Sequence, residues 1–542
     1  MNPSDEAVTA EDATPRDGAE HDAAAATALA AGHPALVWRR TIADTETPVA
    51  AALKLIEPGR GDYLLESVEG GAVRGRHTLL GLAPDLVFRA RGNDAEINPR
   101  WLTDRTAFAP VEGGALDALR GLVAACRMEV PPELPRALAT LVGYFAYETV
   151  GLVERLPRPA PNPLDLPDML FVRPTLLLVF DRLSDALYWV APVWPDGGSI
   201  AAAVERIEAA QARLASATVP YAPAKAGAPD GEDGALLLPA STSRRSLPSS
   251  RPICPQADGS PEPQLPPARY REMVLAAKDY IAAGDIFQVV LAQRFTLPFP
   301  LPPFDLYRAL RRINPSPFLY FLDLPGFALI GSSPEILVRA RDGEVTIRPI
   351  AGTRPRGLTA HEDEENRASL LADPKERAEH LMLLDLGRND VGRVAAPGSV
   401  RVTDSYMVEF YSHVMHIVSN VVGALDPAKD AIDALLGGFP AGTVSGAPKV
   451  RACEIIAELE PETRGPYGGG VGYFSPDGSM DSCIVLRTAV VKDGTMHVQA
   501  GAGIVADSDP ASEQRECEAK AGALIAAARE AMMRAGEAGF GQ

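Results

Sequence analysis

Residues 349–357 contain the densest set of groups in the chain that could bind an anion. Their sequence is Pro349-Ile350-Ala351-Gly352-Thr353-Arg354-Pro355-Arg356-Gly357. Prolines fix the backbone and glycines let it approach a ligand closely, while Thr353, Arg354 and Arg356 offer hydrogen-bond donors. The segment therefore predicts a rigid binding loop for a negatively charged ligand.

A glutamate lies on the apolar side of a predicted helix. Asp373-Pro374 is typical of a helix start. Glu379 is followed three, four and seven positions later by the apolar residues Met382, Leu383 and Leu386. This spacing places a carboxylate among apolar side chains, where it needs a partner. The pattern alone fits equally well a glutamate that compensates the helix dipole.

A second helix is predicted to start at Asp509-Pro510 and to carry Glu516 and Lys520. On spacing alone these two residues form a solvated i, i+4 ion pair worth about 0.2–0.5 kcal/mol. If Glu379 and Glu516 converge instead, their charges repel and a cation must lie between them. Two carboxylates with water and ligand oxygens suit Mg²⁺. Both readings stay open at this point.

Composition excludes several classes of protein. With 542 residues, 46% hydrophobic and 23% charged, the chain is typical of a soluble globular protein. The net charge of −19 argues against nucleic-acid and anionic-membrane partners, so an anionic ligand needs a local positive pocket or a metal. Five scattered cysteines without a CxxC pair favour a reducing cytoplasm. The longest apolar stretch, residues 138–153, contains Glu148 and is too broken to cross a bilayer.

The sequence divides into four regions by composition. Residues 1–33 are rich in Ala, Asp, Glu and Thr without a basic segment before an apolar run, which predicts a disordered acidic tail. Residues 34–222 mix strand-like and helical patterns and predict an N-terminal α/β domain. Residues 223–267 are rich in Pro, Ser, Gly and Arg and predict a linker or insertion. Residues 268–535 predict a second patterned domain.

Ten motifs in this second domain resemble, in the same order, the catalytic domain of the synthase component of anthranilate synthases, a branch of the chorismate-utilising enzymes. They are Gly284–Val290, Gly331–Glu335, Pro349–Gly357, Lys375–His380, Arg388–Asp390, His413–His416, Phe439–Lys449, Tyr467–Tyr473, Arg487–Thr488 and Gly501–Gly503. The resemblance implies an α/β (α+β) fold of two subdomains, with a β-sandwich core and helices outside. It also implies the reaction of chorismate with ammonia to give anthranilate and pyruvate, the first step of tryptophan biosynthesis.

The resemblance assigns roles to individual residues. For catalysis it implies Glu335 as the acid that protonates the leaving hydroxyl, His416 for the proton transfers around pyruvate loss, and Lys520. For chorismate binding it implies Gly352, Thr353, Tyr467, Arg487, Gly501, Ala502 and Gly503. Glu379 and Glu516 are expected to hold the cofactor Mg²⁺, and the metal to hold the ring carboxylate.

Regulation and a partner are also implied. Ser67 lies in a segment that resembles the family's tryptophan-binding strand, and residues 314–318 resemble the opposite wall; the expected tryptophan contacts are Ser67, Pro317, Phe318 and Leu319. The sequence contains no Gly-x-Cys-x-Gly element of a glutaminase. Ammonia is therefore expected from a separate glutamine amidotransferase subunit, which makes a hetero-oligomer the expected assembly.

Three alternatives remain at the level of the sequence. Aminodeoxychorismate synthases commonly carry a nucleophilic lysine where this chain has Ala351. Isochorismate- or salicylate-forming relatives use a lysine base near Gln288, whose neutral amide cannot act as a base. The third alternative is an inactive tryptophan-binding subunit, against which the retained ionisable residues argue.

Overall fold

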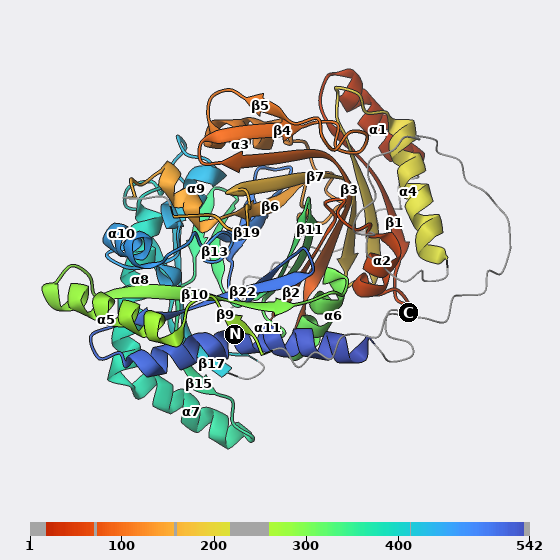
Figure 1. Cartoon of the computed structure of the whole chain (residues 1–542). Helices are drawn as coiled ribbons and strands as arrows, with labels where there is room; N and C mark the ends of the chain where they lie inside the picture. The colour runs from red at the N-terminus through yellow and green to blue at the C-terminus, as the bar shows by residue number, and fades with distance from the viewer. Residues whose placement is uncertain (1–17, 70–72, 157–159, 217–259, 412–413, 536–542) are drawn as a thin grey trace.

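The computed structural model describes residues 18–69, 73–156, 160–216, 260–411 and 414–535. In this part of the chain the strands pair antiparallel in one continuous hydrogen-bonded network, and the helices lie around it (Figure 1). The predicted mixed α/β class is therefore confirmed.

Two rows of strands start from the long neighbours β3 (Val73–Arg91) and β7 (Met169–Asp181). The row beginning at β7 continues through β6 (Leu141–Phe145), β19 (Gly470–Phe474), β20 (Met480–Ile484), β13 (Ile336–Arg341), β14 (Glu344–Ile347) and β17 (Val414–Ala424), which also pairs β15 (Ile350–Pro355) and β16 (Arg401–Phe410). The row beginning at β3 continues through β2 (Tyr63–Glu69), β11 (Phe318–Leu324), β12 (Phe327–Ser333), β21 (Thr488–Lys492), β22 (Thr495–Ile504) and β10 (Gln288–Pro298). Shorter or flanking strands are β1 (Ala35–Ile42), β4 (Asp94–Asn98), β5 (Ala109–Val111), β8 (Ala186–Val193), β9 (Glu262–Pro263) and β18 (Gly446–Ala447). Because residues of both rows line one cavity, the rows face each other as the layers of a sandwich.

The helices are α1 (Gly18–Ala30), α2 (Pro48–Leu55), α3 (Ala115–Ala125), α4 (Ile200–Ala215), α5 (Pro267–Ala283), α6 (Pro303–Ile313), α7 (Ala360–Ala372), α8 (Pro374–Gly392), α9 (Ala431–Gly438), α10 (Lys449–Leu459) and α11 (Pro510–Arg534), with short 3₁₀ turns at η1 (Tyr147–Leu152) and η2 (Gly442–Val444). The predicted starts of α8 and α11 are confirmed: the side chains of Asp373 and Asp509 accept backbone N–H groups of the first turn, and proline follows each. Within the described residues, no helix has the length and apolar character needed to cross a membrane.

The expected N-terminal and catalytic regions share their sheets. Strand β6 lies between β7 of the first region and β19 of the second, and β2 lies between β3 and β11. Segments more than 200 residues apart in sequence are thus hydrogen-bonded neighbours. The expected division at residues 34–222 and 268–535 follows the chain but does not separate two independent sheets.

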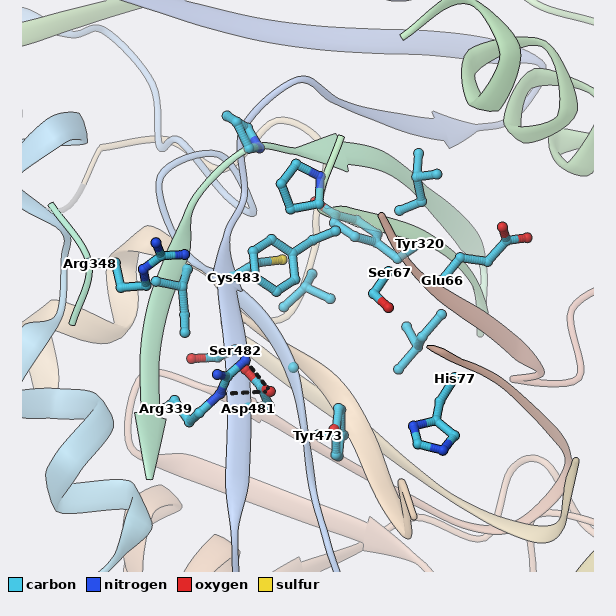
Figure 2. A pocket seen from close by; sticks show the side chains of 18 of the residues that line it. Glu66, Ser67, His77, Tyr320, Arg339, Arg348, Tyr473, Asp481, Ser482 and Cys483 are labelled. Carbon is cyan, nitrogen blue, oxygen red and sulfur yellow. Dashed lines mark hydrogen bonds and ion pairs between the residues drawn. The ribbon is translucent and has the colours of Figure 1, made fainter. Parts of the chain in front are cut away.

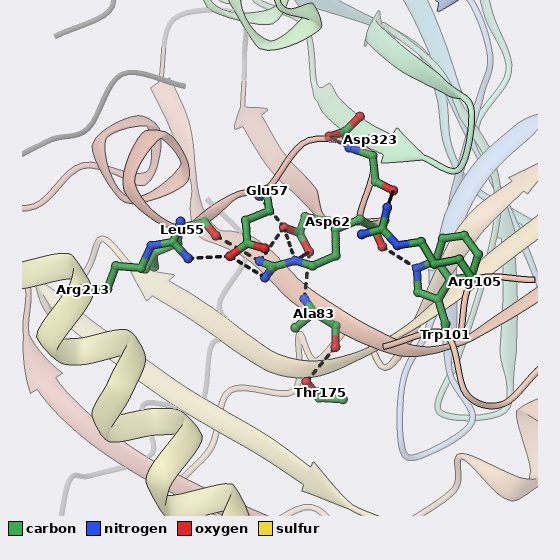
Figure 3. A network of polar contacts seen from close by, with 11 residues as sticks. Leu55, Glu57, Asp62, Ala83, Trp101, Arg105, Thr175, Arg213 and Asp323 are labelled. Carbon is green, nitrogen blue, oxygen red and sulfur yellow. Dashed lines mark hydrogen bonds and ion pairs between the residues drawn. The ribbon is translucent and has the colours of Figure 1, made fainter. Parts of the chain in front are cut away.

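A buried carboxylate reinforces the same junction (Figure 3). Asp62 is fully buried, accepts the backbone N–H groups of Glu57 and Ala83 at 2.9 and 2.8 Å, and binds the Arg60 guanidinium at 2.7 Å. The Asp62 carbonyl oxygen accepts the backbone N–H of Asp323, at the end of β11, at 2.9 Å. Buried charge is tolerated here because each side-chain oxygen has several donors.

The prediction of a disordered tail is wrong over Gly18–Ala30, which forms α1. Asp22 binds Arg39 of β1 at 2.7 Å, and the His21 ring stacks on Trp38 at 4.2 Å. Alanine has the highest helix propensity, and these two contacts hold the helix on the sheet. Residues 1–17 of the expected tail and residues 223–259 of the expected linker lie outside the described part of the chain.

Candidate active site

The structure gathers the predicted catalytic and substrate-binding residues where the two layers meet α8 and α11. Glu335 lies between β12 and β13, Gly352 and Thr353 in β15, His416 in β17, Tyr467 before β19, Arg487 directly before β21, Gly501–Gly503 in β22, Glu379 in α8, and Glu516 and Lys520 in α11. Hydrogen bonds link some of these residues, and interactions between their charges link Glu335, Arg487, His416, Glu379 and Glu516. The expected set is therefore one spatial group rather than scattered positions.

His416 is oriented by the backbone of the signature segment. Its Nδ1 lies 2.8 Å from the carbonyl oxygen of Gly352 and 3.2 Å from the Thr353 hydroxyl. Because a carbonyl oxygen only accepts, Nδ1 carries the proton and Nε2 is left with a lone pair. Burial lowers the pKa of His416 below its ordinary value, and the nearby charge of Arg487 lowers it further. The neutral imidazole is therefore favoured, and its Nε2 lone pair is available as an acceptor.

The pKa of Glu335 is shifted upward, whereas that of His416 is shifted downward. Its Oε2 accepts a hydrogen bond from the Thr443 hydroxyl at 2.9 Å. Burial raises the pKa of the Glu335 carboxyl above its ordinary value, although the Thr443 hydrogen bond and the Arg487 charge oppose the shift. A carboxyl that keeps its proton more readily is suited to act as a general acid.

Arg487 is the cation that faces this space. It is half-buried, its backbone adopts φ = +48°, and no carboxylate of the described residues lies within ion-pair distance of its guanidinium. Burial lowers the pKa of Arg487, while the charge of Glu335 opposes that shift. A non-glycine residue in the left-handed region and an unpaired, half-buried charge both mark functional positions. Its planar guanidinium matches a ligand carboxylate.

Two arginines of the signature segment do not have the predicted role. Arg354 binds Asp373 at 2.7 Å and Glu376 at 3.1 Å. Arg356 binds Asp363 at 2.6 Å. Their donors fix β15 to α7 and α8, so neither guanidinium is free to receive an anion. The prediction that these two arginines bind the ligand is therefore wrong.

Strand β22 provides a close backbone wall. A Cβ at Gly501 would lie 2.7 Å from the Tyr467 hydroxyl oxygen, and one at Gly503 would lie 2.6 Å from the Gln288 amide nitrogen. Only glycine fits both positions without displacing those groups. Ala502 is fully buried, so its contribution to a site is its backbone. Lys520 donates to the Gly501 carbonyl oxygen at 2.9 Å and fixes α11 to this wall.

The two expected metal ligands lie near each other, and Glu516 also has a protein partner. Lys520 Nζ lies 2.7 Å from Glu516 Oε1, so the i, i+4 pair forms between two half-exposed side chains. Burial and the nearby charge of Glu376 raise the pKa of Glu379, and the charge of Glu516 adds to the shift. Repulsion between carboxylates indicates a place that gains from a bound cation.

The donor set fits Mg²⁺ better than a transition metal. Among the described residues there is no cluster of three or more His, Cys, Asp or Glu side chains that could hold a metal. Mg²⁺ commonly takes only one or two protein carboxylates and completes its shell with water and substrate oxygens. Glu379 and Glu516 supply donors of that kind.

A second site, separate from the first, lies between the two layers (Figure 2). Its cavity of about 820 Å³ is lined by all four expected tryptophan contacts, Ser67, Pro317, Phe318 and Leu319. Figure 2 labels Ser67 among the side chains of this lining. Ser67 and Phe318 are opposite each other in the β2–β11 ladder. An aromatic ring beside a serine and prolines suits a small amphipathic ligand with an aromatic side chain.

Two walls of this cavity contact the first site. The Tyr411 ring lines the cavity and lies 5.3 Å from the His416 ring. Tyr320 also lines the cavity, and its hydroxyl lies 2.5 Å from the hydroxyl of Thr488, the residue after Arg487. Sequence reasoning missed Tyr411, Tyr320 and Thr443. Thr443 lies within the recognised motif Phe439–Lys449, which could have indicated it; nothing local distinguishes the two tyrosines.

Comparisons with known proteins agree with this geometry. Residues 74–526 match the model of the family described as chorismate binding enzyme. The chain is 50% identical to anthranilate synthase component 1 of Cereibacter sphaeroides over 94% of its length and 98% of that protein. It is 46% identical to the Thermus thermophilus protein of the same name, over 90% of this chain and 97% of that one.

Solved structures give the same result. The crystal structure of anthranilate synthase component I from Streptococcus pneumoniae superposes with a TM-score of 0.69 at 34% identity, covering 90% of this chain and 99% of that one. The menaquinone-specific isochorismate synthase of Escherichia coli superposes with a TM-score of 0.64 at 19% identity, over 94% and 99% of the two chains, which supports the fold alone. The family match and the high identities together show that this chain belongs to the chorismate binding enzymes.

Proposed function

We propose that this chain is the synthase component of an anthranilate synthase, which converts chorismate and ammonia to anthranilate, pyruvate and water. One arrangement carries the proposal: the unpaired Arg487 lies near Glu335, whose pKa is raised, and near the neutral His416. Chorismate has two carboxylates to bind and a hydroxyl that must leave with a proton. The names of the relatives support the same reaction.

Each group then has a role in one reaction. Arg487 binds the enolpyruvyl carboxylate bidentately, and the close β22 backbone places the ring against Tyr467. As ammonia adds at C2, Glu335 protonates the departing C4 hydroxyl, which leaves as water. His416 Nε2 takes part in the proton transfers that accompany pyruvate loss and aromatisation. Ala351 provides no amine at the position of the lysine nucleophile, which disfavours an aminodeoxychorismate synthase.

Glu379 and Glu516 would hold Mg²⁺ at this site. The bound ion would supply positive charge for the ring carboxylate of chorismate. The acidic residues at this position cannot supply that charge themselves. Lys520 would remain fixed to the Gly501 carbonyl oxygen while Glu516 exchanges its ion pair for the metal.

Ammonia is proposed to come from a glutamine amidotransferase partner. The family's component numbering implies a second component, and this sequence has no glutaminase nucleophile motif. A partner of that kind makes the working enzyme a hetero-oligomer.

The proposal predicts that the purified chain forms anthranilate from chorismate, Mg²⁺ and ammonium without any glutaminase. Because neutral ammonia is the nucleophile, the rate at fixed total ammonium should rise as the pH is raised into the alkaline range. Chromatographic identification of the product is the measurement, with glutamine in place of ammonium as the control. Formation of isochorismate or aminodeoxychorismate, or glutamine-dependent anthranilate formation by the chain alone, would contradict the proposal.

We predict that Glu379→Gln and Glu516→Gln each abolish ammonia-dependent turnover in a folded protein, since either change removes one carboxylate of the Mg²⁺ site. Isothermal titration with Mg²⁺ gives a readout apart from activity, and both variants should bind the ion more weakly. Glu518→Gln, on the same helix, is a matched control that should bind like the wild type. Activity that resists EDTA, or unaltered Mg²⁺ binding in both variants, would refute the metal assignment.

We also propose that tryptophan binds the cavity around Ser67 and inhibits the enzyme. Ser67→Phe should fill the cavity and leave activity insensitive to tryptophan, because a ligand that no longer binds cannot shift the equilibrium between states. Inhibition curves for the wild type, Ser67→Phe and the smaller change Ser67→Ala test this. An inhibition constant for Ser67→Phe equal to that of the wild type would place the tryptophan site elsewhere.

A further inference from the structure

We infer that the buried ion pair between Arg464 and Glu460 is a positioning unit for the chorismate site, an inference that rests on the proposed function. Both side chains are almost completely buried, with exposed fractions of 1% and 4%, and their closest atoms lie 2.6 Å apart. Neither residue belongs to the catalytic set described above. Their importance follows from what they bind.

The pair is bidentate, and both side chains also bind the backbone of neighbouring segments. Arg464 Nε and an Nη atom donate to the two oxygens of Glu460 at 2.9 and 2.6 Å. The other Nη atom donates to the carbonyl oxygen of Val444 at 2.6 Å, and the Nη atom that binds Glu460 also donates to the carbonyl oxygen of Val290 at 2.7 Å. Glu460 also accepts the backbone N–H of Ala292 at 2.8 Å. One charged pair therefore fixes the backbone of two further segments.

Each fixed segment contributes to the proposed site. Val444 follows Thr443, whose hydroxyl binds Glu335. Val290 and Ala292 of β10 pair with Gly503 and Gly501, the close backbone wall. The Arg464 guanidinium therefore joins the segment of Thr443 to strand β10.

The same guanidinium supports the substrate-facing tyrosine. Its central carbon lies 5.6 Å from the centre of the Tyr467 ring and 4.6 Å from that of Tyr147, distances typical of cation–π contacts. Tyr467 in turn points its hydroxyl at Gly501, where no Cβ would fit. The Arg464 guanidinium thus helps to position the Tyr467 ring without itself contacting the substrate in this proposal.

The N-terminal region also binds the backbone of the segment that contains Arg464 and Gly465. Both oxygens of Glu148 accept backbone N–H groups, from Arg464 at 2.7 Å and from Gly465 at 3.0 Å. The backbone N–H of Tyr147 donates to the Gly465 carbonyl oxygen at 2.8 Å. Residues far from the catalytic motifs in sequence therefore orient the segment that leads to Tyr467.

A buried ion pair is a costly way to gain stability, because desolvation offsets most of the attraction. An apolar pair of similar volume would fill the same space without fixing the two further backbone segments. A positioning role follows because, besides two hydrogen bonds to Glu460, the guanidinium donates to the backbone of Val444 and Val290, which adjoin residues of the proposed site.

Arg464→Lys tests the inference, since it keeps the charge and loses the bidentate fork. Arg173→Lys is the matched control: Arg173 binds Asp85 at 2.8 Å in the N-terminal region, with an exposed fraction of 10%, and has no assigned role in the reaction. Thermal unfolding temperatures, KM for chorismate, KM for ammonium and kcat are measured for the wild type and both variants.

Positioning predicts a rise in KM for chorismate or a fall in kcat of about 10- to 100-fold in Arg464→Lys, with KM for ammonium little changed. Arg173→Lys should lose stability and keep wild-type kinetic constants. Should Arg464→Lys fail to fold, Glu460→Gln decides, because it keeps the shape and one acceptor. Wild-type kinetics in a folded Arg464→Lys or Glu460→Gln, or equal kinetic loss in the control, would overturn the inference. A wild type that forms no anthranilate would instead refute the proposed function.

Discussion

One electrostatic constraint organises this molecule: a chain with a net charge of −19 must keep a cation available to an anionic substrate. Under the proposed function Arg487 would be that cation, because it is half-buried and no carboxylate of the described residues lies within ion-pair distance of it. Such a charge is unfavourable in the free protein, as its lowered pKa indicates. The rest of the structure must therefore hold it in place and surround it with groups that act on the bound ligand.

The interleaved strands provide that rigidity. Arg487 directly precedes β21, which pairs with β12 and β22, so its backbone is fixed between the acid loop of Glu335 and the glycine wall. The cavity around Ser67 lies against the same elements through Tyr411 and Tyr320. A ligand that moves either tyrosine would move His416 or the segment beside Arg487. If tryptophan binds this cavity as proposed, these contacts provide a physical connection from the cavity to the residues proposed for catalysis.

Local patterns predicted the elements well and the contacts less well. The starts of α8 and α11 follow from Asp-Pro pairs that carry their own capping groups, and the motif order identified the family. Helix α1 was missed because its stability comes from β1, outside its own sequence. Arg354 and Arg356 were misassigned because their acidic partners lie 7 to 22 positions later, and only the fold shows that those partners are in reach. Nothing in the sequence around Arg464 indicates that its side chain binds the backbone of β10.

Substitution of Arg487 by methionine, followed by two measurements on the same protein, tests the central claim most directly. If the unpaired guanidinium exists to receive a carboxylate, Arg487→Met should weaken equilibrium binding of chorismate by about 100-fold or more, because a buried charge pair is lost. The free protein should unfold at the same or a higher temperature, since an uncompensated half-buried charge is removed. Unchanged chorismate affinity, or a large loss of stability without loss of affinity, would show that Arg487 supports the fold and that the substrate charge is bound elsewhere.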